Sequence, residues 1–138
     1  MIILCIDYGE ARTGLAICDN SQILASPLDT IFEKDRGRLI ERIKAVAIER
    51  SVGFLVVGEP LNMDGSRGSR AAECAYFAKE LSEACALPYA MCDERLTTIQ
   101  AHNELNFTNT RGKKRKKVVD SLAAVMILEN YLARQRLV

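Results

Sequence analysis

The strongest constraint on the fold of this chain is a set of short apolar runs that end abruptly in polar or glycine-bearing turns. The first run, residues 2–6, is rich in β-branched side chains and stops at Asp7. Residues 54–58 and 89–92 form similar runs, and the second of these stops at Asp93. Short, continuous apolar runs are typical of buried strands. The chain is therefore expected to build a sheet in which strands end at charged residues.

Amphipathic segments separate the later strands. Short turns between the first three strands favour an antiparallel meander, and helices between the later strands favour parallel crossovers. We therefore expect an α/β fold with a mixed five-stranded sheet and the order βββαβαβαα. The expected strands are residues 2–6, 15–18, 23–28, 54–58 and 89–92, and the expected helices are residues 34–50, 69–86, a segment opening at Thr97, and 118–135.

Size and composition favour one globular domain over residues 1–138. The chain has a mass of 15.3 kDa and is 49% hydrophobic and 27% charged, which excludes disordered and collagen-like classes. No apolar stretch approaches the ~20 residues of a membrane helix, and no signal-peptide pattern is present, so we expect a cytoplasmic protein without a membrane partner. Five cysteines without CxxC spacing and a single His102 exclude a Cys/His zinc site.

Acidic residues on separate elements point to metal-ion chemistry. Asp7 ends the expected central strand, at the edge where open α/β sheets bind ligands. Asp93 and Glu94 end the fifth strand, where alternation allows only one of them to join Asp7. Asp120 lies on the largely apolar final helix, where a charge is costly unless it is paired or binds a metal. Turn formation and helix dipoles are the plainer explanations for these acids. Oxygen ligands of this kind suit Mg²⁺ or Mn²⁺.

Basic residues are concentrated near the expected final helix. The net charge is +1, but a cluster of six Lys and Arg side chains falls within seven residues just before Asp120. Such a run alone is consistent with a solvated loop at 107–117, whereas beside a metal-type acid it predicts a polyanionic substrate. The candidate phosphate contacts are Arg67, Arg70, Arg95, Arg111, Lys113, Lys114, Arg115, Lys116 and Lys117.

Four motifs, at residues 6–9, 56–65, 93–98 and 116–121, occur together and in order. In this combination the chain resembles the YqgF (RuvX) family of bacterial Holliday-junction-resolvase-like nucleases. The resemblance implies a three-layer, ribonuclease H-like fold with helices on both faces of the sheet. It also implies processing of the 5′ end of pre-16S ribosomal RNA, with cleavage of four-way DNA junctions as the alternative. By motif, it implies that Asp7, Glu94 and Asp120 are the catalytic acids that bind Mg²⁺ or Mn²⁺.

Glu59 departs from the family pattern, because family members commonly have an apolar residue at this position. It would be either a fourth carboxylate of the site or a surface acid, and we expect a surface acid.

Two other function classes remain open from the sequence. An ATP-dependent phosphotransferase of the actin and sugar-kinase type shares the fold core, but it needs two lobes and this chain has the length of one. A non-catalytic RNA-binding assembly factor would bind RNA without cleaving it. The expected partner is nucleic acid, either structured RNA or a DNA junction, and the expected state is a monomer or weak homodimer. A resolvase in particular should be a two-fold dimer, because a junction presents two symmetric strands.

Overall fold

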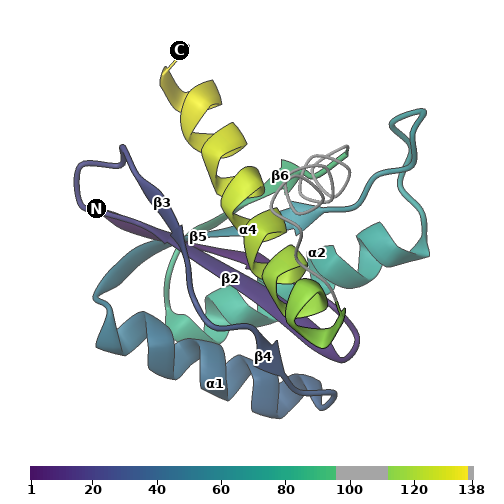
Figure 1. The fold of residues 1–138 in the computed structure, drawn as a ribbon, viewed down its shortest axis with the longest axis horizontal. Helices are drawn as coiled ribbons and strands as arrows, with labels where there is room; N and C mark the ends of the chain where they lie inside the picture. The colour runs from purple at the N-terminus through teal and green to yellow at the C-terminus, as the bar shows by residue number, and fades with distance from the viewer. Residues whose placement is uncertain (96–111, 137–138) are drawn as a thin grey trace.

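The computed structural model describes residues 1–95 and 112–136, with side chains placed in 1–95 and 121–135 (Figure 1). One six-stranded sheet has the order β3-β2-β1-β5-β6, and β4 pairs with β2 off this path. The strands are β1 (Ile2–Asp7), β2 (Arg12–Cys18), β3 (Ala25–Pro27), β4 (Ile31–Phe32), β5 (Val52–Glu59) and β6 (Tyr89–Asp93). The expected α/β fold with a mixed sheet is confirmed.

The pairing directions follow the expected topology. β1 pairs antiparallel with β2 and parallel with β5, and β5 pairs parallel with β6. The sheet has one strand more than expected, because the two-residue β4 pairs with the start of β2. Two residues are too few to show an alternation pattern in a sequence, which explains why β4 was not predicted.

Helices cover both faces of the sheet and complete three layers (Figure 1). On one face, α1 (Arg36–Glu49) and α2 (Ser69–Cys85) pack against alternate residues of β1 and β5, among them Leu4 and Val57. On the other face, α4 (Gly112–Arg136) packs against the intervening residues, among them Cys5 and Val56. Alternation along a strand therefore decides which helix layer each side chain meets.

The last helix begins earlier than expected. We predicted a loop over 107–117 and a helix from residue 118, whereas α4 begins at Gly112, so most of the basic run is helical. The prediction failed because Lys and Arg form helices well but supply no apolar residue to mark a stripe before Val118. The helix expected to open at Thr97 lies outside the described residues.

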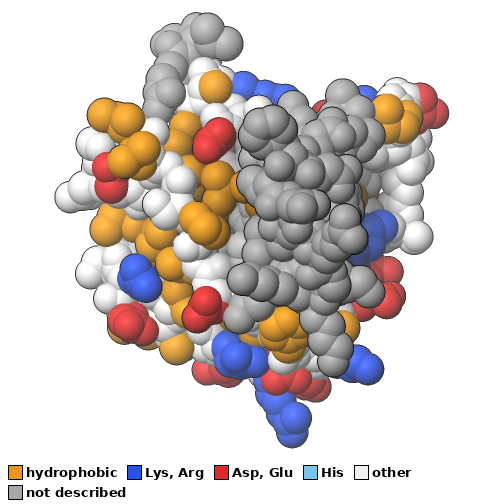
Figure 2. Space-filling model, in the orientation of Figure 1, with side chains coloured by type: hydrophobic (Ala, Val, Ile, Leu, Met, Phe, Trp, Pro, Cys, Tyr) orange, Lys and Arg blue, Asp and Glu red, His pale blue; other side chains and the backbone are white. Residues whose placement is uncertain are grey.

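Some apolar side chains remain exposed away from the helix layers. Ile23 and Leu24, in the turn before β3, are each 68% exposed. Figure 2 shows apolar side chains gathered around β3 and beside α4. Within the part of the chain that the structure describes, no helix has the length and apolarity needed to cross a membrane.

A small buried hydrogen-bond network holds α4 to the sheet. The hydroxyl of Ser121 lies 2.8 Å from the hydroxyl of Thr30, and it donates to the carbonyl oxygen of Leu28 at 3.0 Å. Both hydroxyl residues are buried. Because Ser121 directly follows Asp120, this network fixes the part of α4 that carries the third expected acid.

Replacing Ser121 with Ala removes both of these hydrogen bonds. We expect the free energy of unfolding, measured by urea denaturation, to fall by about 1–3 kcal/mol. Thr30→Val should cost less in the Ser121→Ala background than in the wild type, because the two hydroxyls share one bond. Fully additive costs would show that the hydroxyl groups of Thr30 and Ser121 do not stabilise one another.

Candidate active site

Three parallel strands bring acidic residues to one edge of the sheet. Asp7 is the last residue of β1, Glu59 is the last residue of β5, and Asp93 is the last residue of β6, with Glu94 next in the chain. The carboxyl ends of parallel strands meet at the same edge, which is where open α/β sheets bind ligands. This edge is the candidate active site.

Because side chains alternate in direction along each strand, these acids lie on two different faces of the sheet. Asp7 follows the pattern of Cys5, which faces α4. A Cβ atom on Gly58 would lie 2.2 Å from the Glu94 carboxylate oxygen Oε2 and 3.0 Å from Ile127 Cδ1 of α4. The carboxyl group of Glu94 thus occupies the space left by the missing side chain of Gly58, on the α4 face. There it is hydrogen-bonded to Asp7.

The contact between Asp7 and Glu94 sets the protonation of the pair. A hydrogen bond between two carboxyl groups requires a proton on one of them. Burial raises the pKa of Glu94 above its ordinary value, and the nearby charge of Asp93 raises it further. The hydrogen bond from Asp7 and the positive charge of Arg70 act in the opposite direction. The two carboxyl groups therefore form a half-buried site that holds a proton. A cation could bind to the two carboxylates in place of that proton.

Glu59 and Asp93 lie on the opposite face, away from this pair. They are partners in the β5–β6 register, and each binds an arginine. Glu59 Oε2 lies 2.7 Å from Arg67 Nη2, and Asp93 Oδ2 lies 2.6 Å from Arg95 Nη2. The hydrogen bond from Arg95 holds the pKa of Asp93 below its ordinary value. Of the two adjacent acids at the end of β6, Glu94 is therefore the one that joins Asp7.

The expectation that Glu59 is a surface acid is wrong. Glu59 is only 9% exposed. Residues 60–68 fold back after β5, and Arg67 returns to neutralise the carboxylate. A sequence pattern does not show that return, because the two residues are separated by an irregular loop.

Arg70, in the first turn of α2, supports the chain beside Asp7. Its guanidinium donates to the backbone carbonyl oxygen of Tyr8 and lies 4.9 Å from the centre of the Tyr8 ring. That ring stacks on Phe77 with 4.0 Å between centroids. Arg70 also forms an ion pair with Glu73 at 3.1 Å. Sequence reasoning identified Arg70 only as a phosphate contact, and it did not identify this packing or the space above Gly58.

The remaining expected site residues are described only in part. Asp120, Lys113, Lys114, Arg115, Lys116 and Lys117 lie within α4, and their side chains are outside the described part; Arg111 is outside it altogether. Among the residues whose side chains are placed, no three His, Cys, Asp or Glu side chains form a metal-binding group. The pair Asp7 and Glu94 supplies hard oxygen donors, which fit Mg²⁺ or Mn²⁺.

The cysteines fit the expectation of buried thiols. All five are free, and four of them are buried. Cys5 lies in the core, where burial raises the pKa of its thiol, and the charge of Asp7 adds to that rise. A neutral thiol is a poor nucleophile, so Cys5 is a core residue rather than a candidate for nucleophilic catalysis.

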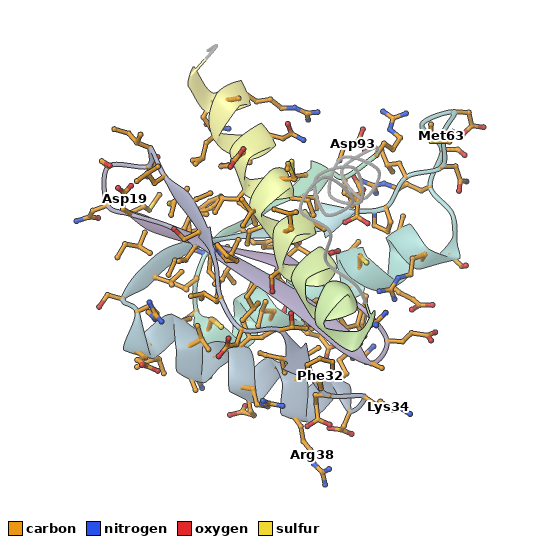
Figure 3. The ribbon with its side chains drawn as sticks, in the orientation of Figure 1. Asp19, Phe32, Lys34, Arg38, Met63 and Asp93 are labelled. Carbon is orange, nitrogen blue, oxygen red and sulfur yellow. The ribbon has the colours of Figure 1, made fainter. Side chains whose placement is uncertain are left out.

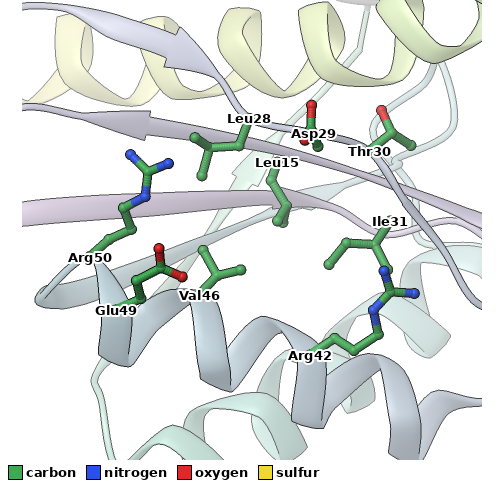
Figure 4. Close-up of a pocket in the computed structure, with 9 residues that line it drawn as sticks. All are labelled: Leu15, Leu28, Asp29, Thr30, Ile31, Arg42, Val46, Glu49 and Arg50. Carbon is green, nitrogen blue, oxygen red and sulfur yellow. The ribbon is translucent and has the colours of Figure 1, made fainter.

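A separate cavity of about 240 Å³ lies between α1 and the segment joining β3 to β4 (Figure 4). Arg42 and Arg50 face it together with Asp29 and Glu49, so its charges balance. None of the acids at the sheet edge lines this cavity. Figure 3 shows Asp93 at the end of β6 and Met63 in the loop between β5 and α2, in a different part of the molecule from this cavity.

The fold defines a class of protein, those with a ribonuclease H-like fold. The structure is similar to RuvC of T. thermophilus in complex with a Holliday junction substrate, with a TM-score of 0.62, 16% identity, and coverage of 99% of this chain and 96% of that one. It is also similar to the Fowlpox virus resolvase in complex with Holliday junction DNA, with a TM-score of 0.60, 12% identity, and coverage of 98% and 99%.

Sequence comparison narrows the class to a family. The family profile described as "RuvX: Holliday junction resolvase" matches residues 1–134. A protein of Thermoanaerobacter pseudethanolicus is 40% identical over 137 residues, 99% of each chain. One from Chloroflexus aurantiacus is 42% identical over 135 residues, 98% of this chain and 88% of its own length. Both are named "Putative pre-16S rRNA nuclease". The chain belongs to the RuvX family, a nuclease family whose reaction class is phosphodiester hydrolysis.

A methyl group at residue 58 should displace the carboxyl group of Glu94. We expect Gly58→Ala to lower nuclease activity about 100-fold, since a shift of about 1 Å in a catalytic group has an effect of that order. Gly53→Ala, on the same strand, is the matched control, because its new methyl group would meet only the flexible side chain of Met1 at 3.3 Å. Equal activities of the two variants would contradict the placement of Glu94.

The raised pKa of Glu94 also predicts a pH dependence of stability in the absence of divalent metal. In the folded state Glu94 holds its proton above the ordinary pKa of 4.5, so the stability it contributes is complete below pH 4.5. That contribution is lost as the pH rises through the raised pKa, with a slope of at most about 1.4 kcal/mol per pH unit. Glu94→Gln should lack this loss. Urea denaturation of both proteins in EDTA from pH 4.5 to 8 measures it, and parallel curves would contradict the assignment.

Proposed function

We propose that this chain is a divalent-metal-dependent nuclease that processes the 5′ end of pre-16S ribosomal RNA. The observation that carries the proposal is the Asp7–Glu94 carboxyl pair at the end of parallel strands, on the face covered by α4. The names of the relatives in the RuvX family support the RNA substrate. The cytoplasm is the compartment we propose, because bacterial ribosomal RNA is made and processed there.

Asp7, Glu94 and Asp120 are the residues that would hold Mg²⁺ or Mn²⁺. When bound at such a site, these ions supply activation of a water molecule and stabilisation of the leaving oxygen of a phosphodiester. Asp7 ends β1, the strand in the middle of the sheet order, on the face that α4 covers, so it would be the central member of the set. The pair would release its shared proton when a metal ion binds, and the positive charge of Arg70 would favour the carboxylate form of Glu94. Ser121 holds the part of α4 that carries Asp120.

The positively charged residues would hold the substrate rather than perform the chemistry. Arg67 and Arg95 project from the same edge of the sheet on the face away from α4, with side chains 65% and 34% exposed. The basic run in the first turns of α4 adds further charge near Asp120. Contacts of this type bind phosphates independently of base sequence. They suit a structured RNA whose recognition depends on its shape.

A DNA four-way junction is the second candidate substrate. It is favoured by the similarity of the fold to two resolvases with bound junctions. A junction presents two strands related by a two-fold axis, so a junction resolvase should act as a dimer. We propose a single domain that is a monomer or weak homodimer, which agrees better with the RNA substrate.

Asp7→Asn tests this proposal because it keeps the shape of the side chain and removes its charge. With Mg²⁺ or Mn²⁺ and a pre-16S RNA fragment beside a synthetic four-way junction, we expect cleavage to fall by about three orders of magnitude or more. Asp35→Asn is the matched control. Asp35 caps α1 by accepting a hydrogen bond from the backbone N–H of Arg38, and Asn caps helices equally well.

Each outcome of this assay has a distinct meaning. Metal-dependent cleavage that survives Asp7→Asn would remove Asp7 from the site. Cleavage by the wild type of the junction alone would replace RNA with DNA as the substrate. RNA binding without any cleavage would make the chain an assembly factor.

A further inference from the structure

Two acid–arginine pairs lie side by side on the face of the acidic edge that points away from Asp7 and Glu94. Glu59 and Asp93 are neighbours in the β5–β6 register, and they bind Arg67 and Arg95 respectively. Both arginines are held by a carboxylate at one end and reach solvent at the other. This arrangement places two positive charges at the same sheet edge as the proposed reaction centre, on the opposite face of the sheet.

The loop at residues 60–68 is built by its own hydrogen bonds. The backbone N–H of Asn62 donates to the carbonyl oxygen of Ser66 at 2.9 Å, and that of Gly65 donates to Asn62 at 2.8 Å. Asp64 accepts from both the N–H and the hydroxyl of Ser66, which holds the pKa of Asp64 below its ordinary value. Gly65 has a φ of 89°, a conformation that favours glycine. The loop is therefore a closed turn stabilised by its own hydrogen bonds.

Two arginine contacts attach this closed turn to the sheet. At its tip, the carbonyl oxygen of Met63 accepts a hydrogen bond from Arg95 Nη1 at 3.3 Å. At its base, Arg67 pairs with Glu59. The residues from 62 to 67 are all exposed, so the loop has little core of its own. These two contacts add to the hydrogen bond that the backbone N–H of Leu61 donates to the carbonyl oxygen of Glu59 at 3.0 Å.

Glu59 attracts Arg67 more strongly than a surface acid would, because its carboxylate is buried. A buried carboxylate needs an opposite charge, and its attraction for that charge is screened less than it would be at the surface. The side chain of Glu59 is 11% exposed, whereas that of Arg67 is 65% exposed. The ion pair joins the Nη2 end of the Arg67 guanidinium to Glu59 Oε2, a buried oxygen for which the described residues supply no hydrogen bond. The rest of the guanidinium is left to face a ligand.

Glu59, the acid that pairs with Arg67, is close in the chain to the proposed reaction centre. Glu59 directly follows Gly58, above which the carboxyl group of Glu94 lies. The carbonyl oxygen of Glu59 also accepts a hydrogen bond from the backbone N–H of Glu94 at 3.1 Å. The position of Arg67 is thus tied to the same short stretch of backbone that positions the acid pair.

We propose that Glu59 is a positioning residue that fixes Arg67 to contact a phosphate of the nucleic acid next to the bond that is cleaved. The inference rests on the proposed nuclease function and extends it to a residue that the family pattern leaves apolar. An arginine already held in place loses less side-chain entropy when it binds a phosphate than a free arginine does. If Glu59 instead neutralised Arg67 and repelled phosphates, Glu59→Leu would bind nucleic acid more tightly than the wild type.

A double-mutant cycle on binding affinity tests the role of Glu59. The variants are Glu59→Leu, Arg67→Ala and the double variant, and the dissociation constant for a fluorescent pre-16S RNA fragment is measured by anisotropy in EDTA, where no cleavage occurs. We expect each single change to weaken binding about tenfold. This is the lower end of the effect expected when a hydrogen bond to a charged group is lost. The double variant should match Arg67→Ala, because Glu59 acts only through Arg67.

Salt dependence and kinetics separate a positioning role from a merely structural one. Arg67→Ala should lower the slope of log affinity against log salt by about 0.7, and Glu59→Leu should lower it similarly. With metal and saturating RNA, kcat should stay within about twofold while KM rises, since the contact is made in the bound ground state. Glu59→Gln keeps the shape but lowers the charge, so it should fall between the wild type and Glu59→Leu, and it replaces Glu59→Leu if that variant does not fold.

The Arg36–Glu80 ion pair provides the matched control. It joins α1 to α2 at 2.9 Å and includes no residue of the acidic edge. Arg36→Ala and Glu80→Leu should leave both affinity and salt slope unchanged.

Additive effects of Glu59→Leu and Arg67→Ala, an unchanged salt slope, or tighter binding by Glu59→Leu would each overturn the inference. Failure of the wild type to bind either the RNA or a four-way junction would instead contradict the proposed function.

Discussion

The contact between the carboxyl groups of Asp7 and Glu94 is the interaction around which the rest of this structure is arranged. It places two acids in a half-buried position, where they are stable only if they share a proton or bind a cation. The parallel pairing of β1, β5 and β6 brings these side chains to one edge. The fold thus places in contact two groups that would repel one another if both were charged, and the binding of a metal ion can relieve that repulsion.

The acids on the two faces of this edge have different partners. Asp7 and Glu94 face α4, which also carries Asp120, whereas Glu59 and Asp93 face away and hold arginines. The period of two along a strand is sufficient to produce this division. Neighbouring residues in the sequence, such as Asp93 and Glu94, therefore have different chemical surroundings. One has its pKa lowered by an arginine, and the other has its pKa raised by burial.

The sequence predicted those parts of the structure that depend on local pattern. The apolar runs located β1, β5 and β6, and alternation predicted that only one of Asp93 and Glu94 could reach Asp7. The burial of Glu59 was not predictable, because it depends on the return of Arg67 across a loop. The start of α4 at Gly112 was missed because its first turns are charged and have no apolar stripe. Long-range contacts and uniformly polar helix ends leave no periodic signal in a sequence.

The missing side chain of Gly58 has a consequence for how this protein can change over evolutionary time. The carboxyl group of Glu94 occupies the volume that a side chain at residue 58 would need. Gly58 is on β5 and Glu94 directly follows β6, yet a substitution at one position alters which residues the other tolerates. A larger residue at 58 would be compatible only with a shorter or displaced acid after β6, so the two positions should vary as a pair rather than independently.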